Sequence, residues 1–163
     1  MALRKLILFS LVLSFNVYAV DKFTPLPQIL NEANANNDKV EYIYVLKRCG
    51  ALLGSVAGYE SKDNRDDAKK LVKINNDGAE FFISTSINAN KKLNLQSNES
   101  LVKDIQEMAI VYVDNFNKNR LLYANIFTGF VEQDYKVCIK LYKDGIKKWK
   151  PVFLFDFLNE SWK

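Results

Sequence analysis

The sequence contains no histidine, and this absence excludes much of the usual chemistry of enzymes. Histidine is the common general base at neutral pH and the group that activates serine or cysteine nucleophiles. It is also the commonest transition-metal ligand, and the two cysteines present are too few for a structural zinc site. No Walker A loop and no G-x-G-x-x-G pattern occurs. The sequence therefore predicts a protein that is not an enzyme and that uses no cofactor or metal.

Carboxylates remain as candidate catalytic groups, but their positions have simpler explanations. Asp63, Asp66 and Asp67 cluster at a predicted helix start, where acidic side chains suit the positive end of the helix dipole. Glu132 and Asp134 lie between the core positions of another predicted helix, which predicts that they occupy a solvated face. Paired acids can hydrolyse glycosidic bonds. A hydrolase built on carboxylates alone is therefore the least favoured of our hypotheses.

Long apolar runs are also missing, except at the N-terminus, where two cations precede an apolar stretch over 6–15. Small residues follow at the two positions that signal peptidase inspects. Residues 1–19 are therefore predicted to be a secretory signal peptide that is cleaved between Ala19 and Val20. The alternative is an uncleaved anchor, but a spanning helix needs about 20 apolar residues, roughly twice the length of this stretch.

Removal of the signal peptide leaves 144 residues, enough for a single helical domain over 20–163. The signal peptide contains two of the 23 cationic residues and none of the 19 anionic ones, so the mature chain carries a net charge of +2. This small charge gives no support for binding nucleic acid. Lysine far outnumbers arginine and asparagine is abundant, which is typical of AT-rich bacterial genomes. The predicted location is the periplasm of a bacterium, or the medium after secretion.

The only two cysteines, Cys49 and Cys138, are predicted to form an intramolecular disulfide. An exported protein meets oxidising conditions, and no spare thiol competes for the pairing. Each cysteine falls on an apolar face of helical period, which directs both sulfurs inward. By the chain-entropy estimate the bond contributes about 4–5 kcal/mol. Two free buried thiols or an intermolecular bond are the alternatives, and the absence of C-x-x-C spacing argues against a redox-active pair.

Helical periodicity organises the rest of the chain into four long amphipathic segments, over 38–58, 64–92, 98–116 and 120–144. Short polar loops join them, which predicts an antiparallel bundle over 38–144. A leader over 20–37 with a short helix precedes the bundle, and a basic, aromatic tail over 145–163 follows it. The predicted fold is all-α: an antiparallel four-helix-type bundle with a short N-terminal helix, a short C-terminal element and one intramolecular disulfide.

Local signals set the predicted ends of these helices. The expected N-caps are Asp38, Asn64 and either Ser97 or Asn98. The stretch N-F-N-K-N over 115–119 is expected to break the third long helix, and Gly145 is expected to stop the fourth.

Glycines create two further questions. Asp77-Gly78 between apolar residues is typical of a hairpin turn. Helical spacing nevertheless continues in phase across the glycine, so one long helix is favoured over a hairpin within 70–85. Gly50, Gly54 and Gly58 line one ridge of a helix, where each destabilises it unless a neighbouring backbone packs against that ridge.

Two features suggest a binding surface. Lys136, Lys140 and Lys143 form a stripe opposite Cys138, and an aromatic tail follows them. The tentative interaction surface consists of Lys136, Lys140, Lys143, Lys147, Trp149, Phe155 and Trp162. The simpler interpretation is a solvated lysine face and a tail that packs on its own bundle. Otherwise these groups would contact an acidic partner or lipid headgroups.

These observations favour a small exported helical protein that binds another protein without catalysing a reaction. Inhibitors, immunity proteins and assembly factors have this general shape, which is an analogy of fold alone. The alternative is a peripheral envelope protein that contacts the membrane surface through its basic, aromatic C-terminal region.

Overall fold

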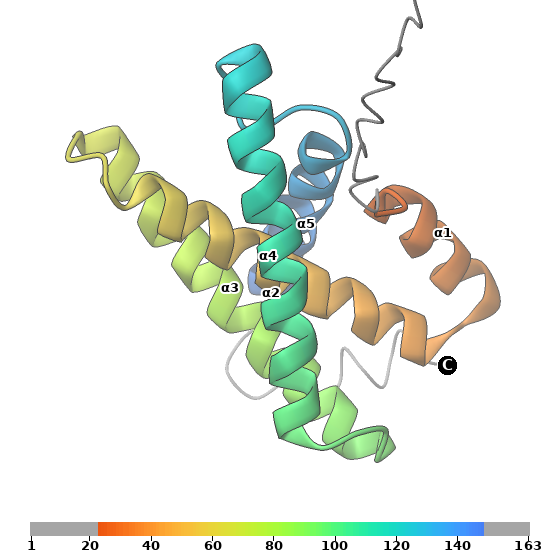
Figure 1. The fold of residues 1–163 in the computed structure, drawn as a ribbon. Coiled ribbons are helices and arrows are strands. Elements are labelled where there is room, and N and C mark those ends of the chain that lie inside the picture. The colour runs from red at the N-terminus through yellow and green to blue at the C-terminus, as the bar shows by residue number, and fades with distance from the viewer. Residues whose placement is uncertain (1–22, 149–163) are drawn as a thin grey trace, which may run out of the picture.

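Over residues 23–148, the part of the chain that the computed structural model describes, the protein forms five helices and no strand. The helices are α1 (Leu26–Asn36), α2 (Lys39–Glu60), α3 (Asp66–Leu93), α4 (Asn98–Tyr123) and α5 (Phe130–Lys148) (Figure 1). The predicted all-α fold, with one short helix before four long ones, is confirmed. The predicted signal peptide, its cleavage point between Ala19 and Val20, and the tail after α5 lie outside the described residues.

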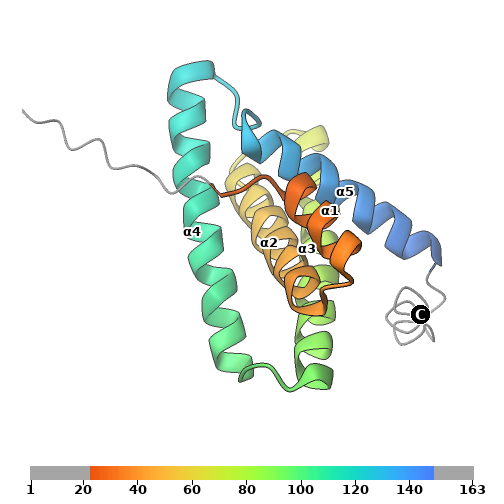
Figure 2. The same ribbon diagram turned by 90° about the vertical axis from the view of Figure 1, so that its right-hand side faces the viewer.

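Helix α2 lies at the centre of the bundle and contacts each of the other four helices. Helix α3 returns along α2, and α4 and α5 lie on opposite sides of it (Figures 1 and 2). Helix α1 folds back against α2 and α5 (Figure 2). Because neighbours surround α2, 12 of its 22 residues are buried. The uncharged run of eleven residues from Cys49 to Tyr59 is the sequence feature that permits this burial.

The disulfide joins this central helix to the last helix. Cys49 on α2 and Cys138 on α5 are both fully buried, and their sulfur atoms lie 2.07 Å apart. The bond closes a separation of 89 residues. The predicted intramolecular pairing is confirmed.

Two of the three predicted N-caps form. The Asp38 carboxylate accepts hydrogen bonds from the backbone N–H groups of Val40 and Glu41, at 2.9 and 3.0 Å. The Ser97 hydroxyl accepts one from the backbone N–H of Ser100 at 3.2 Å. These bonds satisfy N–H groups that the first turn of a helix leaves unpaired.

The predicted cap at Asn64 is wrong. Helix α3 begins one residue later, after Arg65, which provides no side-chain cap. The carboxylate that bonds to the backbone here belongs to Asp63, which accepts from the N–H of Arg65 at 3.0 Å. Asp66 and Asp67 do lie in the first turn of the helix, as expected for its positive end.

Helix α3 runs unbroken through the possible hairpin, so the favoured single helix over 70–85 is confirmed. Gly78 is buried inside it, and a Cβ atom added there would lie 2.6 Å from Cδ1 of Leu53. The glycine therefore serves close packing of α3 on α2 rather than a turn. On α2, Gly50 plays the same part against Ile83, whereas an added Cβ at Gly58 would meet nothing within 4 Å.

The predicted break at 115–119 is wrong, because α4 continues to Tyr123. Phe116 is fully buried, and the asparagines beside it bond within the structure instead of ending the helix. The Asn115 side chain donates to the carbonyl of Val111 at 2.8 Å, and the Asn119 side chain donates to the carbonyl of Ile126 at 3.0 Å. The second bond ties the following loop back onto α4.

The last helix is consequently shifted along the chain relative to the prediction. Helix α5 begins at Phe130, after Gly129 has adopted a left-handed conformation with φ of 61°. Gly145 does not stop it, because the helix continues to Lys148. Gly145 is buried against Phe81, where an added Cβ would lie 2.7 Å from ring atom Cζ. Close packing explains this glycine.

Candidate functional site

An ionic cluster lies in the core, and we call it the buried clasp: the side chains of Arg48, Tyr112 and Asp134. They come from α2, α4 and α5, and all three residues have 0% exposure. The Arg48 guanidinium forms a salt bridge with the Asp134 carboxylate and also donates to the Tyr112 hydroxyl oxygen at 3.2 Å. The Tyr112 hydroxyl donates to Oδ2 of Asp134 at 2.6 Å. Each member therefore contacts both others.

The buried clasp also holds the start of the described chain. Arg48 donates to the carbonyl oxygen of Thr24 at 2.7 Å, and the backbone N–H of Leu26 donates to Oδ1 of Asp134 at 2.6 Å. The Phe23 ring lies 4.1 Å from the Arg48 guanidinium carbon, a cation–π contact. These bonds fix the start of α1 to α2 and α5.

Electrostatics in the buried clasp follow from burial and pairing. Burial raises the pKa of Asp134, and Arg48 and the bonds from Tyr112 and Leu26 oppose that rise. Burial also raises the pKa of Tyr112, so its hydroxyl keeps its proton and donates. Burial disfavours the charge on Arg48, but Tyr112 and Asp134 outweigh it and raise its pKa. The polar groups of Arg48, Tyr112 and Asp134 bond to one another and to the backbone at the start of α1, which suits a structural role.

The solvated face predicted for Glu132 and Asp134 is wrong for Asp134. Glu132 does lie at the surface, where it pairs with Lys136 at 2.6 Å. Asp134 precedes Cys138 by four residues, so a regular helix places it on the same inward face. That spacing was the signal in the sequence. A helical pattern of apolar residues alone does not register a buried charge.

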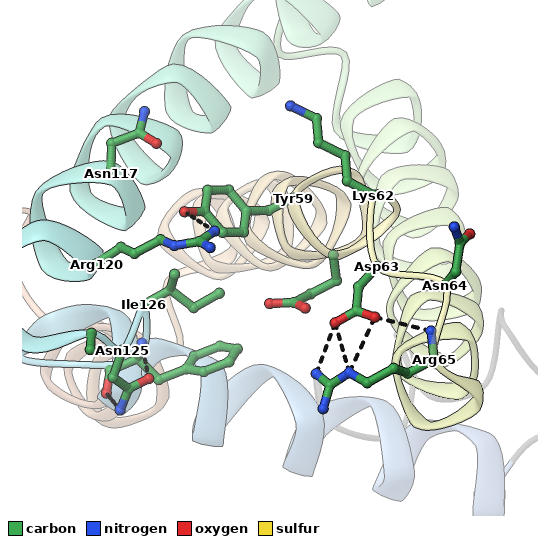
Figure 3. Close-up of a pocket in the computed structure, with 12 residues that line it drawn as sticks. Tyr59, Lys62, Asp63, Asn64, Arg65, Asn117, Arg120, Asn125 and Ile126 are labelled. Atoms are coloured by element: carbon green, nitrogen blue, oxygen red, sulfur yellow. Dashed lines mark hydrogen bonds and ion pairs between the residues drawn. The ribbon is translucent and has the colours of Figure 1, made fainter.

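An open polar hollow of about 770 Å³ lies at one end of the bundle (Figure 3). It forms where the end of α2, the loop to α3, the end of α4 and the loop to α5 meet. Its lining residues are Tyr59, Glu60, Lys62, Asp63, Asn64, Arg65, Asn117, Arg120, Ala124, Asn125, Ile126 and Phe127.

Both signs of charge line the polar hollow. Arg120 donates to the Tyr59 hydroxyl oxygen at 3.2 Å, and its guanidinium carbon lies 5.7 Å from the centre of the Tyr59 ring (Figure 3). Arg65 forms a salt bridge with Asp63 at 2.8 Å. Hydrogen bonds from Arg65 lower the pKa of Asp63, which disfavours its use as a proton donor. The pairing suits recognition of a polar surface better than acid catalysis.

Beside the polar hollow lies the α4 tip, the three apolar residues Leu121, Leu122 and Tyr123 that end α4. Their exposed fractions are 87%, 61% and 62%. A helix packed along its length would bury at least one side of such a turn. Here the last turn of α4 projects beyond its neighbours, so consecutive apolar residues on several sides of the helix stay exposed (Figures 1 and 2).

The predicted lysine surface is only partly described. Lys136, Lys140 and Lys143 are all exposed on α5. Lys136 pairs with Glu132 and Lys140 pairs with Asp144, each at 2.6 Å and four residues apart. Lys147 belongs to α5, and Trp149, Phe155 and Trp162 lie outside the described residues. Acidic neighbours thus compensate two of the three described lysines, so the stripe is weaker as an anion-binding surface than the sequence suggested.

Residues 23–148 contain neither a metal-ligand cluster nor a helix suited to span a membrane. No group of three or more potential metal ligands of the cysteine or carboxylate type occurs among them. None of the helices α1 to α5 combines the length and apolar character that crossing a membrane requires.

Comparison of the chain with protein-family models, with curated proteins and with solved structures gives no match. Any functional assignment therefore rests on the surfaces described above.

Proposed function

We propose that the protein is an exported, non-catalytic module that binds another protein through the α4 tip and the adjoining polar hollow. The observation that carries this proposal is the run of three exposed apolar residues from Leu121 to Tyr123. Aromatic and arginine side chains dominate the binding energy of protein interfaces, and Arg120 lies three residues before Tyr123, which makes the two neighbours on the surface of the helix.

The polar hollow supports the same proposal. Protein interfaces combine an apolar centre with a polar rim. The apolar α4 tip would supply the centre, while Arg120, Lys62 and Glu60 would supply charges of both signs around it. The buried Cys49–Cys138 disulfide suits an oxidising compartment and so supports export.

The alternative is contact with a membrane surface, and one observation favours it. Lys118 and Arg120 closely precede exposed apolar residues at the end of α4, a combination that also suits the interface between lipid headgroups and acyl chains. This alternative places the contact on α4, whereas the sequence suggested the C-terminal region.

The test uses the purified mature protein with the photo-cross-linking residue p-benzoylphenylalanine in place of Leu122. Irradiation in an extract of the source organism should yield one predominant cross-linked protein, identified by mass spectrometry. Adding Tyr123→Asp should reduce that product at least tenfold. The same cross-linker in place of Ile74, an exposed apolar residue of α3, is the matched control and should not yield it.

Co-sedimentation with vesicles that contain anionic phospholipid separates the two candidates. Vesicle binding that Leu122→Asp abolishes would support the membrane alternative and contradict the proposal. A cross-linked product that forms equally well from position 74 would also contradict it.

A further inference from the structure

An apolar patch that the core only partly buries lies where the last helix ends. We call it the α3–α5 patch: Phe81 of α3 with Tyr142 and Ile146 of α5. The rings of Phe81 and Tyr142 meet edge to face with their centroids 5.5 Å apart, and both residues are half-buried. Ile146 lies one turn after Tyr142 on the same face of α5 and is 47% exposed. The patch is continuous with the core through Phe82, whose buried ring contacts that of Phe81.

Two glycines shape the α3–α5 patch. The Phe81 ring lies over Gly145 of α5, where an added Cβ atom would approach it to 2.7 Å. The Tyr142 ring lies over Gly78 of α3, where an added Cβ atom would lie 3.7 Å from it. Each ring therefore rests on the facing helix with part of its surface still exposed. The patch has a fixed shape against which a further apolar segment can pack.

The chain continues directly from this patch. Helix α5 ends at Lys148, two residues after Ile146, and the tail over 149–163 follows. Eight of these fifteen residues are valine, leucine, phenylalanine or tryptophan. So many apolar side chains are rarely left in water together. A tethered segment meets a neighbouring surface at high effective concentration, so the patch is the apolar surface that the start of the tail encounters first.

The exposed apolar residues of α4 are a more distant surface. Figure 2 shows α4 along one edge of the molecule and the end of α5 at the opposite edge, with α2 and α3 between them. The tail would have to pass around the bundle to reach α4, whereas the α3–α5 patch adjoins its first residue. Chain continuity therefore favours the patch as the docking site.

Pro151 limits how far the helical pattern of α5 can extend. In a continuing helix its ring would clash with the carbonyl group of residue 147, and it lacks the N–H group that the helix would use. It also disfavours the helical conformation at residue 150. The sequence therefore ends the helical face of the patch at Trp149, seven residues after Tyr142. A change of direction there lets the apolar run over 152–155 return over the patch.

The border of the patch suits an uncharged segment. Lys73 and Asp77 pair at 2.6 Å across one turn of α3, and Lys140 and Asp144 do the same on α5. The charges over 73–80 and 140–144 sum to zero, and they belong to Lys73, Asp77, Glu80, Lys140, Lys143 and Asp144. The run over 152–155 carries no charge. Its docking is therefore driven by burial of apolar surface and meets no charge repulsion.

We propose that the start of the tail, over 149–155, docks on the α3–α5 patch of its own chain. Trp149 covers Phe81 and Ile146, and the apolar run over 152–155 closes over Tyr142. Burial of aromatic and aliphatic surface stabilises this contact. The docked segment extends the core at the end of α5, so its aromatic residues are not available to contact a membrane. This docking does not depend on the binding of a partner protein by the α4 tip.

Tryptophan fluorescence tests the contact, because Trp149 and Trp162 are the only tryptophans of the chain. In the full-length chain with Trp162→Phe, Trp149 is the single reporter. Acrylamide should quench it at least threefold less in the native protein than in urea, and Ile146→Asp should remove most of that protection. Ile110→Asp, the same change at an exposed isoleucine of α4, is the matched control and should leave the quenching unchanged. Circular dichroism should show native helix content in both variants.

A second reporter tests the returning run. Phe153→Trp, in a chain with both natural tryptophans replaced by phenylalanine, should be protected from acrylamide to a similar degree. Ile146→Asp should expose this tryptophan as well.

Quenching of Trp149 in the native protein as strong as in urea, or protection that Ile146→Asp leaves intact, would overturn the proposal. Protection that disappears on hundredfold dilution would also overturn it and would identify a second copy as the occupant. Protection that requires vesicles of anionic phospholipid would overturn it in favour of a membrane. Cross-linking from position 122 should survive Ile146→Asp, which keeps this docking distinguishable from the binding of a partner at the α4 tip.

Discussion

At the scale of single residues, the buried clasp shows how one ion pair can organise a core. Arg48 and Asp134 lose all contact with water, a cost that their mutual attraction offsets only with good hydrogen-bond geometry. Tyr112 and two backbone groups at the start of α1 complete that geometry. Such a pair contributes less to net stability than to fixing where residues 24–26 attach.

We predict that Asp134→Asn destabilises the protein by about 3–5 kcal/mol, because Arg48 would keep a buried charge without a counter-charge. The double variant Arg48→Met with Asp134→Leu should lose less than Asp134→Asn alone, since it removes both charges together. Urea unfolding followed by circular dichroism measures both changes. A double variant that is less stable than the single one would show that the ion pair itself supplies the stability.

A second ion pair, between Lys47 and Asp104, should make stability depend on pH. The Lys47 ammonium lies 2.7 Å from Asp104, and this hydrogen bond lowers the pKa of the carboxyl group despite partial burial. Because the folded pKa is below the unfolded one, the contribution is present above an unfolded pKa of about 3.9 and disappears as the pH falls through the folded pKa.

Asp104→Asn should therefore be less stable than wild type at pH 7 by up to about 1 kcal/mol, the range of partly exposed pairs. Near pH 2 or so, well below the unfolded pKa, the unfolded carboxyl group is protonated and the folded one loses part of its charge, so the difference should be smaller. Urea denaturation of both proteins at the two pH values measures this. An equal difference at both pH values would mean that the asparagine acts through packing rather than charge.

At the scale of helices, close contacts decide where glycine is tolerated. Along the predicted glycine ridge of α2, an added Cβ atom would make a tight contact at Gly50, an ordinary contact at Gly54 and no contact at Gly58. Close approach of α3 to α2 therefore justifies the first glycine, but not the last. A close contact also explains Gly145, because the ring of Phe81 occupies the space that a side chain at this position would need. Helix α5 continues past this glycine.

Two alanine substitutions on α2 should consequently have opposite effects. Gly50→Ala would place Cβ 2.8 Å from Cγ1 of Ile83, and this overlap should destabilise the protein by about 1–3 kcal/mol. Gly58→Ala meets nothing within 4 Å and should stabilise it by up to about 1 kcal/mol through helix propensity. Thermal unfolding of both variants measures the effects. A stabilising Gly50→Ala would mean that α3 can move away from α2 without loss.

At the scale of the whole molecule, the disulfide restrains the long connection between the central helix and the last one. Helix α5 contacts α1, α2 and α3, and only the loop after α4 joins it to the preceding helix. A bond from Cys138 to the centre of the bundle therefore limits how far α5 can separate from it when the protein unfolds. The benefit comes mainly from the unfolded chain, whose freedom the bond reduces.

Replacement of both cysteines by alanine should lower the free energy of unfolding by about 4–5 kcal/mol, the chain-entropy estimate for a loop near 90 residues. Urea unfolding of the variant and the oxidised wild type gives this difference. Wild-type protein treated with dithiothreitol should lose a similar amount. A loss below about 1 kcal/mol would indicate that the reduced unfolded chain keeps α2 and α5 together.

Most features set by neighbours in sequence were predicted correctly, although the cap at Asn64 was not. Apolar spacing identified α2 and the unbroken α3, and Asp38 and Ser97 were recognised as caps. The pairing of Cys49 with Cys138 followed instead from their being the only two cysteines. The predicted end of α4 was wrong. Asn115 and Asn119 were expected to break the helix, but their side chains bond to the carbonyls of Val111 and Ile126. Asp134 was misplaced because an apolar pattern does not register a charge whose partner lies 86 residues away.

The sequence by itself determined the helical period, the caps at Asp38 and Ser97 and the inward position of both sulfurs, since each depends on residues within a few turns of one another. Tertiary structure alone decided which charge was buried, how far α4 projects and which glycines pack closely. These properties depend on which side chains from distant segments meet, and a local pattern carries no information about that. The α4 tip, which carries the proposed function, belongs to this second group: Leu121–Tyr123 are exposed because the neighbouring helices end before they do.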